Sequence, residues 1–272
     1  MLNDITMGQY YPVDSPVHRL DPRTKLLITI GLIICTFLIH TLAGYILLLA
    51  FVFFTAKAAK VPFGMLIRGL RPLRLIIILT FALNLFFTSG GTTLLQWGFI
   101  RISKEGLFQA IHYSLRLVFL VLCTSMLTLT TSPVALSDGI EILLGPLKKI
   151  HFPVHELAMM MTIALRFIPT LLEETDKIMK AQMARGADFE SGNLISRAKA
   201  MVPLLVPLFV SAFRRAGDLA MAMESRCYRG GDNRTRLRVL KMTSHDLYAF
   251  LILLVLIGLI VLEGIFLKGI IP

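Results

Sequence analysis

Long runs of apolar residues, separated by basic connections, dominate the chain. Residues 26–56 contain no fixed charge over 31 positions. One membrane crossing needs only about 20 apolar residues, so this run predicts a helical hairpin that turns near residues 40–44. Three further apolar runs lie at 73–88, 107–131 and 247–267. The pattern therefore predicts five membrane spans.

The segment between the fourth and fifth spans has a helical periodicity of its own. Apolar residues recur at spacings of three and four, which predicts a helix at about 155–185 with a kink at Pro169. A second helix is predicted at about 194–228, bent at Pro203 and Pro207. Helices this apolar need a cover, which is one another, the underside of the membrane or other subunits.

Composition agrees with a membrane protein. Hydrophobic residues make up 56% of the chain and charged residues 17%, and the mean hydropathy is +0.74. We therefore expect an all-α membrane protein. The three cysteines, Cys35, Cys123 and Cys227, form no CxxC pair, so the sequence indicates neither a disulfide framework nor a zinc site. We expect no metal and no cofactor bound directly by this chain.

Basic residues predict the orientation of the spans. Residues 1–25 carry Arg19, Arg23 and Lys25, and the connection after the second span carries five basic residues and no acidic one, which favours the cytoplasmic side for both. The loop 89–106 carries little charge and is the predicted outer loop. This alternation divides the chain into a cytoplasmic N-terminal segment (1–25), spans one to four (26–131), a cytoplasmic coupling region (132–245) and the last span with the C-terminus (246–272). The expected location is a prokaryotic plasma membrane, crossed several times.

The net charge of +11 does not require nucleic acid as a partner. The coupling region holds 16 of the chain's 28 basic residues, interleaved with 11 acidic ones, and most of the others flank the predicted spans. Topology accounts for most of this charge, with the lipid bilayer as the expected neighbour.

The two predicted cytoplasmic helices end in a similar way. The endings are Ala184, Arg185 and Gly186 in the first helix and Ser225, Arg226 and Cys227 in the second. A purely structural explanation is that Gly186 ends the helix in a left-handed conformation and Arg185 complements the helix dipole. This explanation fits the second ending less well, so we expect the repeated feature to be the small residue and the arginine rather than the cap. A planar guanidinium makes bidentate contacts to carboxylates, which predicts two acidic receptor grooves.

The chain resembles the transmembrane T component of energy-coupling factor (ECF) vitamin transporters over nearly its whole length. The resemblance rests on the order and the residues of four blocks, which are "YYPVDSPVHRLDPRTKLL" before the first span, "ALRFIPTLLEE" at 164–174, "AQMARGADF" at 181–189 and "VPLLVPLFVSAFRRAGDLAMAMESRCY" at 202–228. The first block favours a shared vitamin-type module over a dedicated cobalt or nickel system.

This resemblance implies a scaffold that couples two ABC-type ATPase subunits to an interchangeable membrane S component. ATP is then bound by the partner ATPases and the vitamin by the S component. The family's two arginine motifs dock into grooves of the ATPase pair, and they correspond here to the two endings named above. The second ending departs from the family's usual Ala-Arg-Gly at both flanks.

Two other classes of function were weighed against this resemblance. A membrane-embedded enzyme needs titratable groups in one cavity, and the spans offer chiefly His40, His112 and Glu263, at places predicted to be span ends or outer surfaces. A self-sufficient channel or carrier needs a polar path through the spans, and their polar content is low. The sequence has no GxxxxGK[ST], GxSxG or HExxH motif. Arg116 lies inside the fourth span and is consistent with a functional role or with a buried tie to a neighbouring helix.

Two local patterns predict helix starts. Asp21 and Pro22 have the order of an N-cap and a first helical residue. His151 and His155 have a spacing that suits a metal on one continuous helix, but Pro153 interrupts it. The second pattern therefore favours a helix entry over a metal site.

Overall fold

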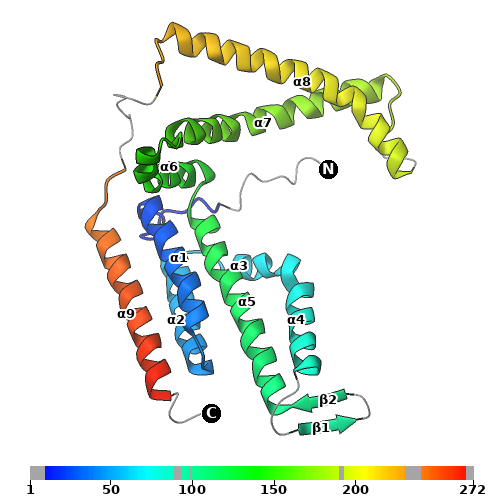
Figure 1. Cartoon of the computed structure of the whole chain (residues 1–272). Coiled ribbons are helices and arrows are strands. Elements are labelled where there is room, and N and C mark those ends of the chain that lie inside the picture. Colours follow the sequence, from blue (N-terminus) through cyan, green and yellow to red (C-terminus); the bar gives the residue numbers. More distant parts are fainter. Residues whose placement is uncertain (1–9, 89–92, 98–99, 190–192, 231–239, 268–272) are drawn as a thin grey trace. The chain divides into compact units, whose positions relative to one another are not determined.

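The computed structural model describes residues 10–88, 93–97, 100–189, 193–230 and 240–267 (Figure 1). They form two compact units. The first, called here the bundle unit, comprises the described residues of 8–139 and 239–272. The second, called here the long-helix unit, comprises those of 140–238.

The bundle unit consists of helices and one short β-hairpin. Its elements in chain order are α1 (Pro22–Leu38), α2 (Leu42–Ala58), α3 (Phe63–Leu70), the 3-10 turn η2 (Arg71–Leu73), α4 (Arg74–Phe87), β1 (Thr93–Trp97), β2 (Ile100–Ser103), α5 (Lys104–Thr130), the start of α6 (Pro133–Leu143) and α9 (Ser244–Leu267). The all-α class is confirmed. The small exception among the described residues is the antiparallel pair β1–β2, which pairs Trp97 with Ile100 within the predicted outer loop.

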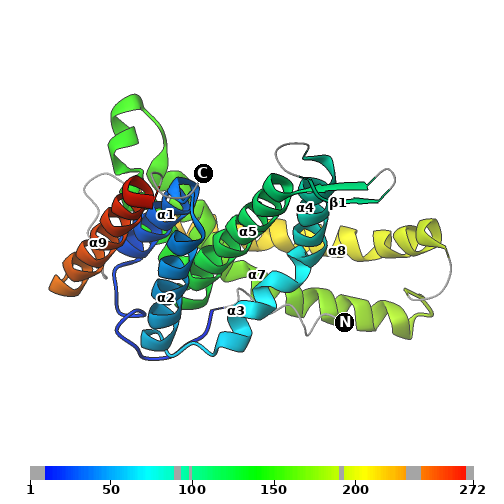
Figure 2. The same cartoon turned by 90° about the horizontal axis from the view of Figure 1, so that it is seen from below.

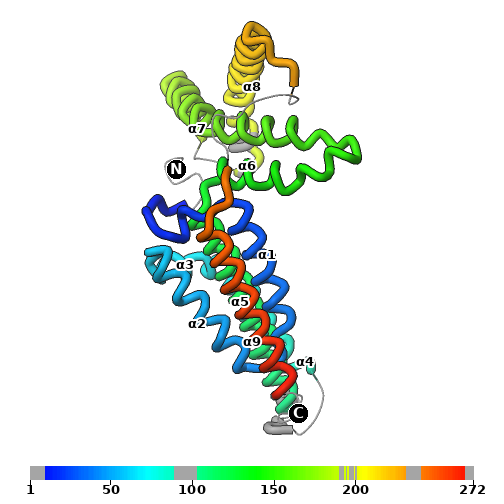
Figure 3. Tube along the Cα trace, turned by 90° about the vertical axis from the view of Figure 1, so that its left-hand side faces the viewer, coloured from blue at the N-terminus to red at the C-terminus, as the bar shows by residue number. Residues whose placement is uncertain are grey.

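The predicted hairpin over 26–56 is confirmed as α1 and α2. The chain turns at residues 39–41, and the Thr41 side chain accepts a hydrogen bond from the Gly44 amide (3.4 Å) at the start of α2. The α1–α2 turn lies at the same end of the bundle unit as the C-terminal end of α9, because Thr41 also donates a hydrogen bond to Glu263. Figure 3 follows this arrangement along the tube of the bundle unit.

Span lengths differ from the prediction in two respects. Helices α1 and α2, predicted as the first two spans, have only 17 residues each and are shorter than the helices that qualify by length, and one predicted cytoplasmic helix does qualify. Among the described residues, four helical stretches are long and apolar enough to cross a membrane, namely Phe63–Phe87, Lys104–Thr130, Val154–Ala184 and Ser244–Phe266. The third stretch was predicted to be a cytoplasmic helix. It meets the length and composition of a span, yet it carries seven Asp, Glu, Lys or Arg residues where Ser244–Leu267 carries two. This charge is why the cytoplasmic location stays our prediction.

Packing in the bundle unit centres on α1, α2, α5 and α9. Their buried apolar residues form one core, which includes Cys35, Leu48, Val52, Cys123 and Ile260. By contrast, α4 buries none of its residues, as expected for a helix that faces lipid or a partner. Apolar burial gives little driving force between helices inside a bilayer, so close packing and hydrogen bonds must fix their arrangement.

A group of buried charges ties the helix ends together where α1 and α9 begin and α5 ends. The Asp246 carboxylate accepts hydrogen bonds from the Asp21 amide (2.9 Å) and from the Thr243 amide and hydroxyl (both 2.8 Å). The Lys25 ammonium donates to the His18 and Thr130 carbonyl oxygens (both 2.9 Å). We call Asp21, Lys25 and Asp246 the polar lock.

The polar lock also contains the predicted start of the first helix. Asp21 is the N-cap of α1 and accepts a hydrogen bond from the Arg23 amide (2.9 Å), with Pro22 as the first helical residue. The Arg23 guanidinium donates a hydrogen bond to the Leu240 carbonyl (3.1 Å), in the segment before α9. The capping prediction is confirmed, and the cap is part of a connection between distant parts of the sequence.

The polar lock gives a first prediction. Replacing Asp246 with leucine removes the acceptor of three hydrogen bonds and leaves the buried Lys25 with less compensating charge. Leaving a buried hydrogen-bond donor without its acceptor costs about 1–3 kcal/mol. The thermal unfolding midpoint of the purified chain in detergent should therefore fall sharply. The control is Asp14→Ala, which removes an exposed ion pair with Arg19 and should change the midpoint little. Equal unfolding midpoints for Asp246→Leu and Asp14→Ala would contradict a stabilising role of the polar lock.

Candidate docking site at the ends of the long helices

Two long helices form most of the long-helix unit. They are α7 (Val154–Ala184) and α8 (Leu194–Ser225), preceded by the end of α6 and the 3-10 turn η3 (Gly145–Ile150). At 31 and 32 residues they are roughly 46–48 Å long. They run antiparallel beside each other in both views (Figure 1, Figure 2). The predicted helices are confirmed, although α8 ends three residues earlier than expected.

The entry into α7 is built as the sequence predicted. His151 adopts a left-handed conformation (φ 60°) and Pro153 is the N-cap of α7. The His155 imidazole contacts the Glu141 carboxylate (3.0 Å) and lies 3.5 Å from the Tyr228 hydroxyl. No group of three or more His, Cys, Asp or Glu side chains in the described parts of the chain could hold a metal ion. His155 therefore connects α6, the start of α7 and the residues after α8.

A second connection joins the two long helices near the middle of each. The Glu174 carboxylate of α7 accepts hydrogen bonds from the Ser211 hydroxyl and from the Arg215 guanidinium of α8 (2.8 and 3.2 Å). The ion pair is partly exposed, with 21% and 38% of the two side chains accessible. The sequence analysis missed this connection. The sequence does show an acidic and a basic residue on two amphipathic helices. Their positions along the chain do not show which residues of the two helices face each other.

The end of α7 is a Schellman cap. The Gly186 amide donates to the Met183 carbonyl (2.9 Å) and the Ala187 amide donates to the Gln182 carbonyl (3.0 Å). Gly186 has a φ of 90°, in the left-handed region that this cap requires. Arg185 is the C-cap residue itself, with φ −91° and ψ 7°.

The end of α8 has the same cap. The Cys227 amide donates to the Glu224 carbonyl (2.8 Å) and the Tyr228 amide donates to the Met223 carbonyl (3.1 Å). Cys227 occupies the glycine position with a φ of 56°, and Arg226 is the C-cap residue with φ −91° and ψ 13°. The two arginines thus leave their helices with nearly identical backbone angles.

This repetition corrects one prediction. The sequence indicated that the arginine with its small neighbour was repeated and that the cap was not, because Cys227 is not a glycine. In the structure the cap is repeated as well. The left-handed conformation costs a residue with a side chain roughly 1–2 kcal/mol, and here it leaves two helix-end carbonyls hydrogen-bonded. The backbone pattern of the ending therefore overrides the residue preference at this position.

Both arginine side chains are exposed. Neither Arg185 nor Arg226 forms a hydrogen bond through its guanidinium, or an ion pair, with any residue that the structure describes. The remaining motif residues, Ala184, Gly186, Ser225 and Cys227, are exposed too. Small exposed neighbours leave the guanidinium groups accessible to a partner surface.

The surroundings of the second arginine include a cavity of about 550 Å³. Residues of α7 and of the end of α8 line it, among them Met159, Ile163, Met223, Arg226 and Tyr228. The same Tyr228 contacts His155, so the cavity and the entry to α7 share a wall. The end of α8 therefore lies beside a cavity large enough to receive a side chain of a partner.

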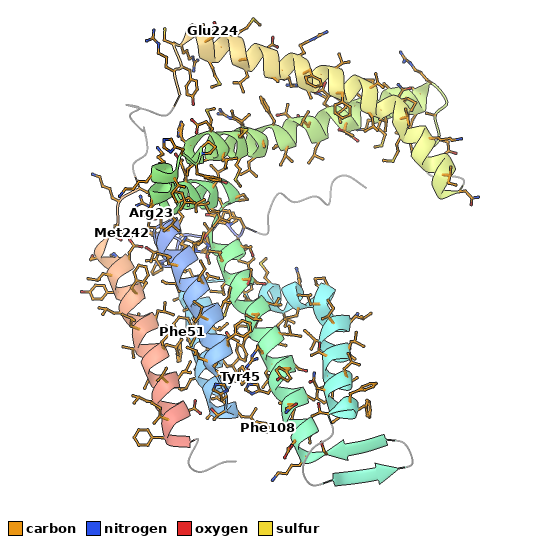
Figure 4. The ribbon with its side chains drawn as sticks, viewed as in Figure 1. Arg23, Tyr45, Phe51, Phe108, Glu224 and Met242 are labelled. Carbon is orange, nitrogen blue, oxygen red and sulfur yellow. The ribbon has the colours of Figure 1, made fainter. Side chains whose placement is uncertain are left out.

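Arg116, in the bundle unit, is a tie to neighbouring side chains. Its guanidinium carbon lies 5.3 Å from the centre of the Phe37 ring of α1, and one nitrogen lies 3.2 Å from the His112 imidazole. His112 in turn lies against Tyr45, which Figure 4 labels on α2. Of the two interpretations left open for Arg116, this geometry favours the buried tie. None of His40, His112 and Glu263 lines the cavity beside Arg226 or the two cavities of the bundle unit described below.

The fold defines a class, a helical membrane protein, and sequence comparison identifies the family within it. Residues 14–237 match the family model CbiQ, described as cobalt transport protein. The chain is 55% identical over 266 residues to the energy-coupling factor transporter transmembrane protein EcfT of Clostridium kluyveri, covering 97% of this chain and 98% of the relative. It is 58% identical over 250 residues to the protein of the same name from Thermosediminibacter oceani (92% and 94% covered) and 53% identical over 261 residues to that from Bacillus subtilis (96% and 98% covered).

The chain therefore belongs to the EcfT family of transmembrane T components. It is a membrane component of an ECF transporter. The resemblance drawn from the four sequence blocks is confirmed.

The cap on α8 gives a second prediction. Cys227→Val places a β-branched residue at positive φ, where such residues are strongly disfavoured, so the cap should open. The amides of residues 227 and 228 should then lose hydrogen-exchange protection. Cys227→Gly should retain it, because relief of roughly 1–2 kcal/mol of backbone strain exceeds glycine's entropic cost of about 0.5–1 kcal/mol. The matched control is Gly186→Val, which should open the α7 cap in the same way. Unchanged protection in both valine variants would contradict the shared cap geometry.

Proposed function

We propose that this chain is the coupling and scaffold subunit of an ECF-type importer. It transmits the motion of two ATPase subunits to a substrate-binding S component and so drives vitamin uptake. The observation that carries the proposal is the pair of exposed arginine caps, which have the same backbone geometry and no partner among the described residues. Two equal endings suit two equal receptors, as a pair of like ATPases provides.

The chemistry of the caps supports docking over a purely structural role. An arginine that only complements the helix dipole contributes typically 0.3–1 kcal/mol, and a lysine would serve equally well. A guanidinium adds a planar fork that binds a carboxylate in a groove through two hydrogen bonds. Rotation of an ATPase subunit would then move the helix end held in its groove.

The long helices also offer a surface for the S component. Their exposed apolar side chains include Met160, Met161, Val206, Phe209 and Phe213, each 47–74% accessible. Unbranched methionine side chains repack readily against different partners, which suits an S component that is exchanged. We infer that this surface, within 157–179 and 201–223, contacts the S component.

The remaining roles follow from this assignment. ATP is bound by the ATPase subunits and the vitamin by the S component, and no nucleic acid takes part. The N-terminus and residues 132–245 face the cytoplasm, where the ATPases lie. The rival functions, a membrane-embedded enzyme and a self-sufficient carrier, predict an active solitary chain, whereas coupling predicts activity only in a complex with the other subunits.

The arginine caps give a third prediction. Replacing Arg185 or Arg226 with alanine should weaken ATPase retention and ATP-dependent uptake in reconstituted vesicles, and the double variant should lose both. A buried, partner-bound arginine contributes on the order of 2–5 kcal/mol to an interface. Lysine at either position should rescue incompletely, because it retains the charge without the planar fork.

The matched control is Arg214→Ala, which removes an exposed arginine of α8 away from the caps. It should keep the ATPases bound. Wild-type ATPase retention and uptake in the double variant would reject docking and leave helix capping as the whole role of both arginines.

A fourth prediction concerns the S component. In a Cys227→Ser background, which removes the exposed native thiol, cysteines introduced at Met161 and Phe209 should crosslink to the S component. The control is a cysteine at the exposed Phe87, the last residue of α4 in the bundle unit, because this position lies outside the proposed surface. Labels at Met161 and Phe209 that react only with lipid or solvent throughout transport would contradict the proposed surface.

A further inference from the structure

The bundle unit contains an apolar cavity of about 270 Å³ that the docking function does not use. Helices α1, α2, α5 and α9 and the segment before α1 enclose it. Its lining includes Ile28, Leu32, Phe51, Met126, Tyr248 and Ile252, and Figure 4 labels Phe51. This volume approaches the lower end of the ~300–1,000 Å³ range of small-molecule sites. Tyr248 and Ile252 are 63% and 57% exposed, so the cavity opens beside the outward face of α9.

A second cavity, of about 450 Å³, adjoins the first and is lined mainly by polar and charged residues; it is called here the polar cavity. The two share Pro16 and His245 as lining residues. The polar cavity adds the charged side chains of Asp14, Arg19 and Lys60. An apolar compartment with a polar one at its mouth matches a molecule that has one hydrocarbon part and one charged part.

The charges of the polar cavity favour an anion. Asp14 is already held by Arg19 through two hydrogen bonds (2.6 and 2.8 Å), and this contact lowers the pKa of the Asp14 carboxyl. Lys60 is exposed and has no ion pair with any described residue, and His245 is exposed at the same cavity. Because Asp14 and Arg19 neutralise each other, Lys60 gives the polar cavity a net positive charge. Lys60 is held in place by a left-handed backbone (φ 55°) directly after α2.

Both cavities lie at the end of the bundle unit where the apolar runs of α2 and α9 give way to charged residues, which is where the membrane boundary is expected. Lys60 follows the end of α2, and His245 is the second residue of α9, whose uninterrupted apolar run starts at Leu247. Figure 3 shows the segment before α1, the end of α2 and the start of α9 at this one end of the bundle unit. A phosphate at this boundary lies at the level of lipid headgroups, and a hydrocarbon chain below it lies among the spans. Basic pockets between membrane helices bind anionic headgroups by the same physics.

We propose that these two cavities together bind one anionic glycerophospholipid. One acyl chain occupies the apolar cavity, and the phosphate lies beside Lys60 and His245. The bound lipid contacts α1, α2, α5, α9 and the segment before α1 at once. It therefore reinforces the end of the bundle unit that the polar lock holds.

The test is native mass spectrometry of the full-length chain with added phosphatidylglycerol or phosphatidylcholine of the same acyl chains. Phosphatidylglycerol should be retained more strongly. Lys60→Gln should lower its affinity about fivefold, as expected for the loss of one basic residue near an anionic lipid. The matched control is Lys57→Gln, one turn earlier at the end of α2 and outside both cavities, which should leave the affinity unchanged.

A second pair of variants tests the hydrocarbon compartment. Ala58→Phe should place a ring in the apolar cavity, which Ala58 lines, and abolish selective retention. Ala43→Phe, at an equally exposed alanine of the same helix that lines neither cavity, should not. Equal retention of both lipids, or wild-type retention in Ala58→Phe, would overturn the proposal. Displacement of the lipid by millimolar inorganic phosphate, with no effect of Ala58→Phe, would identify a phosphate site instead and would also overturn it.

Discussion

Every helix end leaves backbone groups without an intrahelical partner, and this structure is organised by the way those groups are satisfied. Inside a bilayer no water is available to bind them, so the helices of the bundle unit must end at polar partners or at the boundary. Asp21 caps α1, Thr41 caps α2 and Ser103 caps α5, where the Ser103 hydroxyl accepts from the Gly106 amide (2.9 Å). Two of these caps also contact α9, through Asp246 and Glu263. The residues that cap α1 and α2 therefore also attach these helices to α9.

The long-helix unit satisfies the same requirement at its C-terminal ends with backbone groups of the chain that follows each helix. The Schellman caps bind the last carbonyls of α7 and α8 with backbone amides alone, so no side chain is needed for the purpose. That frees the C-cap residue, and both C-caps are arginines whose side chains stay exposed. The backbone provides the helix end, and the side chain stays available for the proposed docking.

Sequence patterns predicted the features that local chemistry decides. The apolar run at 26–56 predicted the α1–α2 hairpin, and the Asp21-Pro22 pair predicted the cap of α1, because both depend on residues close together in the chain. The contact between Asp21 and Asp246 was not predictable in the same way, since 225 positions separate the two. The Glu174–Arg215 pair depends equally on which faces of two helices meet. Cys227 was mispredicted for a different reason. Residues other than glycine rarely adopt the left-handed conformation, but the cap of α8 requires it at this position.

The two units differ in how much of their own surface they bury, and this difference bears on function. In the bundle unit, buried apolar residues of α1, α2, α5 and α9 form a continuous core. Among the described side chains of α7 and α8, the buried apolar ones are Val154, Ala158 and Leu204. Two helices roughly 46–48 Å long cannot be held rigidly by so few contacts and one partly exposed ion pair. Their arrangement must depend on whatever covers their apolar faces. The proposed coupling role needs such an element, because a fully packed core would resist transmitted motion.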